Sequence, residues 1–296
     1  MRVSRTKRDE SQRSDKSCIA IVVFIGFILT IFLFFVVSNL HKSISVTPTY
    51  YDFSVNASSL TSTAFPSAHA SETSNRALNV DQFDLSQLPL LMKPNEIVLF
   101  SKYVIACSQS THCQYLEWGS GGSTELISML MDNSLDIHID SIEHAVPWCT
   151  SMKNNGIVKV AIAINKLTFH CVDTQVPLVV YGRPLNNDTA TLERMQVYIN
   201  YVDTIQKNGK YFDLVLIDGR FRVACGLKLI LAKHIDANSV VLVHDYVGMN
   251  RPYPFLEKYY DKVDLVHGLA VLKVKSDIDF EELQADFDHW RYDAER

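Results

Sequence analysis

The chain has 296 residues, of which 47% are hydrophobic and 21% are charged, and this is enough to build one domain with a sizeable core. Its formal net charge is −5, so no basic surface is available to neutralise phosphates, which argues against a nucleic-acid partner. The spacing of its six cysteines resembles no zinc site.

The chain begins with a basic tail, residues 1–18, and an uncharged apolar run from Ile19 to Ser38 follows. As a helix this run would reach roughly 30 Å, the thickness of a bilayer core. A cleaved signal peptide is the alternative, but such segments are usually shorter and end in a small-residue cleavage site that is not found here. Lysine and arginine gather before the run and only Lys42 closely follows it, so the positive-inside rule puts the N-terminus in the cytosol. We therefore expect a single-pass type II protein of the Golgi or endoplasmic reticulum, with the bulk of the chain in the lumen.

Residues 39–84 are rich in serine, threonine, alanine and asparagine. A segment of this composition buries little apolar area, so it is predicted to be a flexible stem. Two glycosylation triplets begin at Asn56 and Asn187 and agree with a lumenal position, although such triplets are frequent by chance.

Five cysteines follow the apolar run, an odd number for an oxidising compartment. Cys107 and Cys113 are near enough in sequence to close a small loop, and Cys149 with Cys171 could bridge neighbouring elements. Sequence alone does not decide the pairing of these four and Cys225.

Residues 85–296 alternate short apolar runs with helical periods and form the predicted catalytic domain. The predicted strands are 114–118, 135–142, 157–164, 212–217, 239–243, 262–266 and 269–275. The predicted helices are 94–109, 123–132, 145–154, 189–207, 222–234 and 254–260, with one more at the C-terminus. Strands that alternate with helices predict an α/β fold with a doubly wound, mostly parallel sheet. Only His267 and Gly268 separate the last two strands, which predicts an antiparallel edge hairpin.

The most informative pattern lies between the first predicted strand and the helix after it. Glu117 stands near the end of the strand, and the chain then passes through Gly119, Ser120, Gly121 and Gly122. Glycines let a backbone approach a ligand closely, and the following helix offers unpaired N–H groups and the positive end of its dipole. This turn is therefore predicted to bind a nucleotide-like cofactor, with Glu117 either in contact with it or bracing the turn.

Polar residues also follow the other predicted parallel strands, whose carboxyl ends meet at one edge of the sheet. Glu143 follows the second strand and is placed to accept hydrogen bonds from ribose hydroxyls, or to cap a helix. Asp218 ends the fourth strand, and His244 with Asp245 ends the fifth. These three are candidate catalytic residues, because a histidine is a natural general base and the carboxylates can hold a divalent cation. The alternative is that both aspartates only cap helices.

Three arginines, Arg220, Arg222 and Arg251, lie near the same edge in this arrangement. They could grip an anionic substrate group such as a carboxylate or a sulfate, and we name Arg220 and Arg251 as the candidate substrate-binding residues. Trp118 and Trp148 could each pack on an adenine ring, but core packing is the expectation for Trp148.

With these residues in place, the chain resembles the class I S-adenosylmethionine-dependent methyltransferases from about residue 95 to 275. The run from Glu117 to Gly122 is similar to the acidic-x-Gly-x-Gly motif of that superfamily, and Glu143 to its ribose-binding acid. The run from Phe212 to Asp218 looks like its fourth-strand motif, and the closing hairpin is its characteristic edge. The resemblance implies a Rossmann-like methyltransferase fold with S-adenosylmethionine as the cofactor, and a membrane-anchored branch of the superfamily.

The resemblance also raises the question of a metal. In the metal-dependent O-methyltransferases similar to catechol methyltransferase, acidic residues end strands four and five and hold magnesium. Asp218 and Asp245 match these positions, so a divalent cation such as magnesium is a possible second cofactor. The sequence departs from that pattern at Tyr246, where the family has an amide, and at the Gly-Arg pair after Asp218.

Three functions follow from these patterns. The leading one is a lumenal methyltransferase that acts on an oxygen or nitrogen nucleophile of a secretory-pathway acceptor such as a glycan. A type II glycosyltransferase would share the anchor and stem, but its acidic pair would have to be Asp286 and Asp288, in a stretch with helical character. The third is a non-catalytic binding protein that keeps the fold.

Overall fold

The computed structural model describes residues 91–110, 112–131, 135–205 and 211–294. The predicted tail, anchor and stem, residues 1–84, lie outside these residues. Within the described part of the chain, no helix is long and apolar enough to cross a bilayer.

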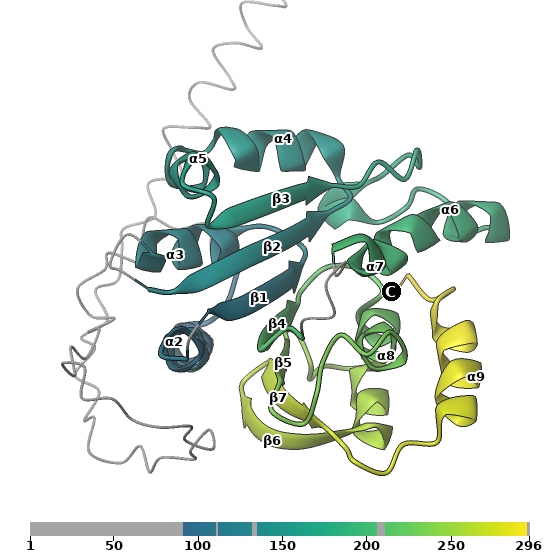
Figure 1. Cartoon of the computed structure of the whole chain (residues 1–296). Coiled ribbons are helices and arrows are strands. Elements are labelled where there is room, and N and C mark those ends of the chain that lie inside the picture. Colours follow the sequence, from purple (N-terminus) through teal and green to yellow (C-terminus); the bar gives the residue numbers. More distant parts are fainter. Residues whose placement is uncertain (1–90, 111, 132–134, 206–210, 295–296) are drawn as a thin grey trace, which may run out of the picture. The chain divides into compact units, whose positions relative to one another are not determined.

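A seven-stranded sheet in the order β3-β2-β1-β4-β5-β7-β6 forms the centre of the domain (Figure 1). Its strands are β1 (Cys113–Trp118), β2 (Ile137–Glu143), β3 (Leu167–Cys171), β4 (Leu214–Ile217), β5 (Val240–Val243), β6 (Tyr260–Val266) and β7 (Leu269–Val274). Strands β1 to β5 pair in parallel, whereas β7 pairs antiparallel with both β5 and β6. The predicted α/β sheet with an antiparallel edge hairpin is confirmed.

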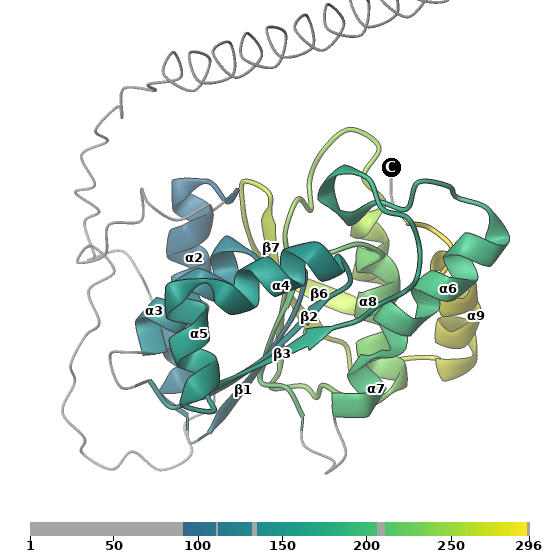
Figure 2. The same ribbon diagram turned by 90° about the horizontal axis from the view of Figure 1, so that it is seen from above.

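Helices cover both faces of the sheet (Figure 2). On one face lie α2 (Pro94–Ser108), α3 (Gly122–Met131), α4 (Val146–Asn154) and α5 (Gly156–Ala163). On the other lie α6 (Thr189–Asn200), α7 (Val202–Ile205), α8 (Arg222–Leu231) and α9 (Phe280–Trp290). Short 3₁₀ helices, η4 (Val180–Gly182) and η5 (Tyr253–Lys258), complete the domain. The predicted helix at 189–207 is thus divided into α6 and α7, and the one at 254–260 is 3₁₀.

Two hydrophobic clusters fill the space between the sheet and its two helix layers. Successive residues of a strand point to opposite faces, and in β1 Leu116 and Trp118 belong to one cluster while Tyr115 belongs to the other. Strands β4 and β5 are buried along their whole length. Continuous apolar runs are what a parallel sheet covered on both faces requires, and they explain why the central strands were recognisable in the sequence.

The predicted strand at 157–164 is wrong, because this segment is helix α5. Its β-branched residues favour a strand locally, but the Asn155 side chain caps a helix by accepting a hydrogen bond from the backbone N–H of Ile157 at 3.2 Å. Val158 and Ala161, three positions apart, are buried while Val160 is exposed, which is a helical pattern of burial. The third strand is instead β3, and it therefore ends at Cys171.

Two disulfides join helices to strands on the same face of the sheet. Cys107 of α2 is bonded to Cys113 of β1, and Cys149 of α4 to Cys171 of β3. These are the two pairs that the sequence suggested without deciding between connectivities. Cys225 is buried in α8, where its Sγ lies 3.7 Å from the backbone oxygen of Arg220.

Candidate functional site

The carboxyl ends of β1 and β4 meet at a close contact between two glycines. Gly119 has φ +88°, a backbone conformation that residues other than glycine rarely adopt. A Cβ on Gly119 would lie 2.6 Å from the backbone nitrogen of Gly219. A Cβ on Gly219 would in turn lie 2.0 Å from the hydroxyl oxygen of Tyr198. The turn at residues 119–122, called the glycine turn below, is therefore held tightly against the end of β4.

The next residues of the glycine turn are held by hydrogen bonds but keep one open side. Gly121 donates its N–H to Thr124 Oγ1 at 3.0 Å, and Ser120 donates its N–H to Glu143 Oε2 at 3.1 Å. A Cβ on Gly121 would meet nothing within 4 Å. Gly122 is the buried first residue of α3. The sequence thus folds into a fixed turn with room beside Gly121 for a ligand to approach the backbone.

Glu117 lies beneath the glycine turn and is fully buried. Four hydroxyl groups from β1, α3 and β2 donate to its carboxylate, namely those of Tyr115 (3.1 Å), Ser123 (3.0 Å), Thr124 and Ser141 (2.6 Å). Burial raises the pKa of Glu117 to about 7, although the four hydrogen bonds oppose this rise. Both carboxylate oxygens accept hydrogen bonds from the protein. Of the two roles that the sequence left open, contact with the cofactor and bracing of the turn, this arrangement favours bracing.

Glu143 lies at the end of β2 beside the glycine turn, as predicted. Its Oε2 accepts from the N–H and the hydroxyl of Ser120, at 3.1 and 3.2 Å, and its Oε1 accepts from the N–H of Ala145 at 2.7 Å. Glu143 is 5% exposed. Because the Ser120 hydroxyl can rotate, a ligand hydroxyl at the turn could take its place on Oε2.

Trp148 does not pack in the core as expected. It is 43% exposed, and its ring nitrogen donates to the backbone oxygen of Ser120 at 2.9 Å. An indole placed on α4 therefore flanks the glycine turn from the side of β2. Trp118, by contrast, is fully buried in β1, where its ring nitrogen donates to the backbone oxygen of Tyr198.

A histidine joins the ends of β4 and β5 to helix α2. His244 Nδ1 is hydrogen bonded to Asp218 Oδ1 at 2.9 Å, and its Nε2 lies 3.5 Å from Glu96 Oε2. Burial alone would lower the pKa of His244, but the hydrogen bond and charge of Asp218, with the charge of Asp245, outweigh burial, and the pKa is raised. Glu96 was not predicted from the sequence, because it is an acidic residue in the first turn of a helix, where such residues are common.

The acid rim, defined as Asp218, His244 and Asp245, is crossed by a buried guanidinium. Arg222, at the start of α8, has Nη2 3.1 Å from Asp218 Oδ1 and Nη1 3.1 Å from Asp245 Oδ2. Its Nε donates to the backbone oxygen of Gly219 at 3.0 Å. Arg222 is only 5% exposed, so it is an internal counter-ion rather than the substrate-gripping arginine that its place in the sequence suggested.

The two arginines predicted to bind substrate have different partners. Arg220 donates from Nε to the backbone oxygen of Tyr181, at 3.0 Å, in the loop between β3 and α6. Arg251 has Nη2 3.8 Å from Asp245 Oδ2, and its Nη1 donates to the hydroxyl of Tyr253. Arg220 and Arg251 are therefore held by different parts of the chain, and their role as substrate-binding residues stays a prediction.

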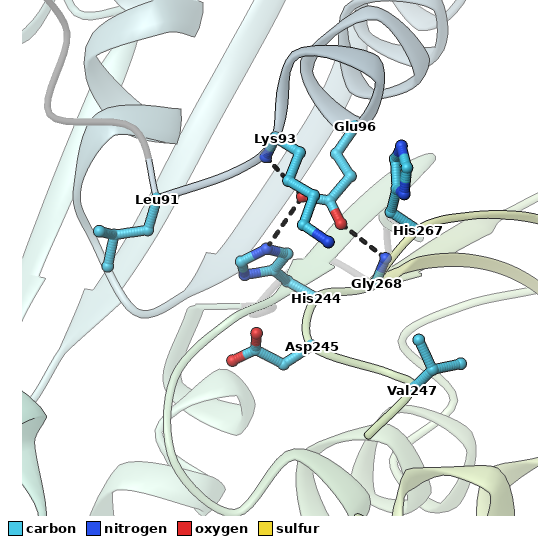
Figure 3. Close-up of a pocket in the computed structure, with 8 residues that line it drawn as sticks. All are labelled: Leu91, Lys93, Glu96, His244, Asp245, Val247, His267 and Gly268. Atoms are coloured by element: carbon cyan, nitrogen blue, oxygen red, sulfur yellow. Dashed lines mark hydrogen bonds and ion pairs between the residues drawn. The ribbon is translucent and has the colours of Figure 1, made fainter. Parts of the chain in front are cut away.

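A pocket of about 370 Å³ opens on the outer side of His244 (Figure 3). It lies between the start of α2, the end of β5 and the β6–β7 turn, and it is lined by Leu91, Lys93, Glu96, His244, Asp245, Val247, His267 and Gly268. Glu96 closes one wall, because its carboxylate accepts from the N–H groups of Lys93 and Gly268, each at 2.6 Å. The pocket therefore combines charged groups with two exposed apolar side chains, Leu91 and Val247.

Comparison with solved structures identifies the architecture. A methyltransferase-like protein from Silicibacter pomeroyi is 24% identical, with a TM-score of 0.53 over 69% of this chain and 97% of that one. This chain has the class I methyltransferase fold. An SAH-bound methyltransferase from Podospora anserina is 13% identical, with a TM-score of 0.39 over 60% of this chain and 79% of that one. No family model and no curated protein matches the sequence.

The divalent cation that some methyltransferase folds hold at strands four and five can be tested against the acid rim. One ligand atom from each of its residues lies within 4.8 Å of the others, which is compact enough for a metal. The same carboxylates, however, already contact the Arg222 guanidinium. As arranged, the rim does not fit a resident magnesium ion.

Proposed function

We propose that the chain is an S-adenosylmethionine-dependent methyltransferase. The observation that carries this proposal is the glycine turn, where Gly119 packs on Gly219 while the side of Gly121 stays open. A turn of this kind at the carboxyl end of the first strand of an open α/β sheet is a binding place for nucleoside cofactors. The methyltransferase fold supports this cofactor over a dinucleotide.

The residues around the turn fit such a cofactor. The backbone of Ser120 and Gly121 would contact its amino-acid part, and Glu143 would accept hydrogen bonds from its ribose. Trp148, half-exposed beside Ser120, offers a ring face for the adenine. When bound, S-adenosylmethionine supplies an electrophilic methyl group on a sulfonium, and the protein supplies position and proton removal.

The pocket beside His244 is the proposed place of the acceptor. With His244 neutral and its Nδ1–H donated to the Asp218 carboxylate, Nε2 would carry the lone pair on the side of the pocket. Nε2 would take the proton of an acceptor hydroxyl or amine, and Glu96, 3.5 Å away, would stabilise the imidazolium that forms. Asp245 lines the same pocket and would hold a polar group of the acceptor.

The proposed location is the lumen of the Golgi or endoplasmic reticulum, with the chain anchored by residues 19–38. The two disulfides support this location, because structural disulfides persist in oxidising compartments. Asn187 is exposed and open to glycosylation. In that compartment a sugar hydroxyl is the proposed acceptor, and S-adenosylmethionine would have to be imported.

A glycosyltransferase is less well supported. Asp286, the first residue of its required acidic pair, lies on helix α9 and contacts Lys258 and the hydroxyl of Tyr259, each at 2.5 Å. That acid is part of a surface ion-pair group rather than a site at a strand end. A non-catalytic binding protein stays as the second candidate, because the fold alone does not establish activity.

Calorimetry on the full-length protein in detergent tests the proposal. We expect S-adenosylmethionine and S-adenosylhomocysteine to bind, and a Glu143→Ala variant to lose most of that affinity. An Asp188→Ala variant, which removes an exposed helix cap far from the turn in sequence, is the control and should bind normally. Binding of a nucleotide sugar without binding of either adenosyl compound would contradict the proposal. Cofactor binding without methyl transfer to any glycan, peptide or lipid acceptor tried would favour the binding protein.

A further inference from the structure

The ends of β4 and β5 face each other through two carboxylates that remain partly open to solvent. The side chain of Asp218 is 26% exposed and that of Asp245 is 45% exposed, while the Arg222 side chain between them is 6% exposed. Ligand atoms of these two acids lie within 4.8 Å of each other, and two carboxylates so close repel each other unless a positive charge lies between them. The rim therefore needs a cation, and the chain already contains one there.

Arg222 uses all three of its nitrogen atoms on oxygen atoms of these two strand ends. Nε donates to the backbone oxygen of Gly219 and Nη2 to that of Asp218, at 3.0 and 3.1 Å. Nη1 donates to the backbone oxygen of His244. Nη2 and Nη1 also contact the carboxylates of Asp218 and Asp245, each at 3.1 Å, so the guanidinium is surrounded by oxygen atoms of the two strand ends.

The position is also fixed from outside the rim. Phe221, which directly precedes α8, has φ +58°, and Asp245 after β5 has φ +56°, both left-handed backbone conformations that are uncommon outside glycine. The ring of Tyr253 lies 5.2 Å from the guanidinium carbon. A guanidinium bound on its edges and covered on one face cannot swing away without breaking this whole set of bonds.

A divalent cation held by both carboxylates would lie beside oxygens that the protein already binds. Asp218 Oδ1 is bound by both Arg222 Nη2 and His244 Nδ1, and Asp245 Oδ2 is bound by Arg222 Nη1. Magnesium needs near-octahedral oxygen ligands at short distance, and the fixed positive charge of Arg222 would lie beside it. Electrostatic repulsion and the loss of the arginine hydrogen bonds both act against metal binding.

We propose that Arg222 is the resident cation of the acid rim, and that its guanidinium takes the place of the divalent metal ion found in metal-dependent methyltransferases of this fold. Arg222 is then a positioning residue, which holds Asp218 and Asp245 in place for His244 and the acceptor pocket. The inference deepens the proposed function, because it makes that reaction independent of divalent cations. It also predicts that a metal site is latent in the rim and opens when the guanidinium is removed.

Manganese binding to the full-length protein, followed by the loss of the free Mn²⁺ signal in electron paramagnetic resonance, tests the inference without any cofactor. The measured quantity is the difference in Mn²⁺ binding between each protein and the same protein carrying Asp218→Asn and Asp245→Asn. Mn²⁺ binding elsewhere on the chain cancels in this difference. We expect no difference for the wild type. We expect Arg222→Ala to gain Mn²⁺ affinity by at least about tenfold through these two aspartates.

Arg222→Lys is the matched control, because it keeps one positive charge and should remain without rim-bound Mn²⁺. Rim-dependent Mn²⁺ binding by the wild type overturns the inference, and so does a folded Arg222→Ala variant that gains none. If Arg222→Ala does not fold, the wild-type and Arg222→Lys measurements decide alone. Calorimetry with S-adenosylmethionine on the same samples keeps a failure of the proposed function separate from a failure of this inference.

Discussion

The glycine turn and the acid rim lie at the same edge of one sheet, but they are stabilised in opposite ways. The turn is braced from below by Glu117, whose partners are hydroxyl groups, and its ligand side beside Gly121 is left open. The rim is closed from within by Arg222, whose partners are the carboxylates themselves. The glycine turn therefore has an open side for a ligand, whereas the negative charges of the acid rim are already neutralised by Arg222.

This difference separates the residues that should govern binding from those that should govern the shape of the site. Changes at the open side of the turn should alter cofactor affinity and leave folding intact. Changes beneath the turn, or within the rim, should alter stability and its dependence on pH. Four substitutions test this division, and they follow from the largest expected effect on stability to the smallest.

Gly219→Ala should have the largest effect, because its Cβ would lie 2.0 Å from the Tyr198 hydroxyl, which has no hydrogen-bond partner among the described residues. We expect a loss of at least about 4 kcal/mol in the free energy of unfolding, above the usual cost of overpacking. Chemical denaturation measures this loss. Tyr198→Phe removes the obstructing oxygen, so the double variant should recover much of the stability, and a double variant no better than Gly219→Ala would refute the explanation.

Glu117→Gln should change how stability depends on pH. The pKa of Glu117 is raised from 4.5 to about 7 in the folded protein, so its protonated form is favoured on folding. The resulting stabilisation is fully present below pH 4.5 and is lost as the pH rises through about 7. The span corresponds to roughly 3 kcal/mol at 1.36 kcal/mol per unit.

The measurement for Glu117 is the difference in unfolding free energy between wild type and Glu117→Gln from pH 4 to pH 8. This difference should fall with rising pH and become constant above about pH 7. Glu193→Gln, at an exposed position of α6, should show no such trend. A difference that does not vary with pH would mean that folding leaves the pKa of Glu117 unchanged.

Arg222→Ala should cost about 2 kcal/mol of stability. This is less than the usual loss on breaking a buried ion pair, because the two carboxylates left behind are partly solvated. Arg251→Ala, which removes a half-exposed contact 3.8 Å from the same Asp245, should cost less than about 1 kcal/mol. Equal losses in thermal or chemical unfolding would show that Arg222 has no special place in the rim.

The sequence predicted the strands of the sheet other than β3 for a physical reason. Buried parallel strands are continuous apolar runs, and the polar residues that end them stand out. Glu143, Asp218 and His244 were found in this way. The segment at 157–164 failed because its local β-branched content suggests a strand, whereas the cap at Asn155 and packing on the sheet make it a helix.

Residues that act through long-range contacts could not be predicted. Glu96 reaches His244 from a helix far away in the chain, and nothing in its surroundings in the sequence marks it. Arg222 looked like one of three similar arginines, and only the fold distinguishes the buried one. Trp148 was expected in the core because tryptophan usually packs there, but its helix turns it toward Ser120.

Gly121→Ala should have the smallest effect on stability, within about 0.5 kcal/mol, because its Cβ meets nothing within 4 Å. The same methyl group would project into the space where the cofactor approaches the backbone. Gly156→Ala at the start of α5 is the matched control, since a Cβ there also meets nothing within 4 Å. The two variants therefore differ only in their distance from the proposed cofactor site.

Calorimetric titration of S-adenosylmethionine into the full-length wild type, Gly121→Ala and Gly156→Ala tests the central claim most directly. The account predicts one cofactor per chain for the wild type and for Gly156→Ala, and a loss of at least about tenfold in affinity for Gly121→Ala, which corresponds to 1.4 kcal/mol. No binding by a folded wild type, or equal affinity in all three proteins, would contradict it.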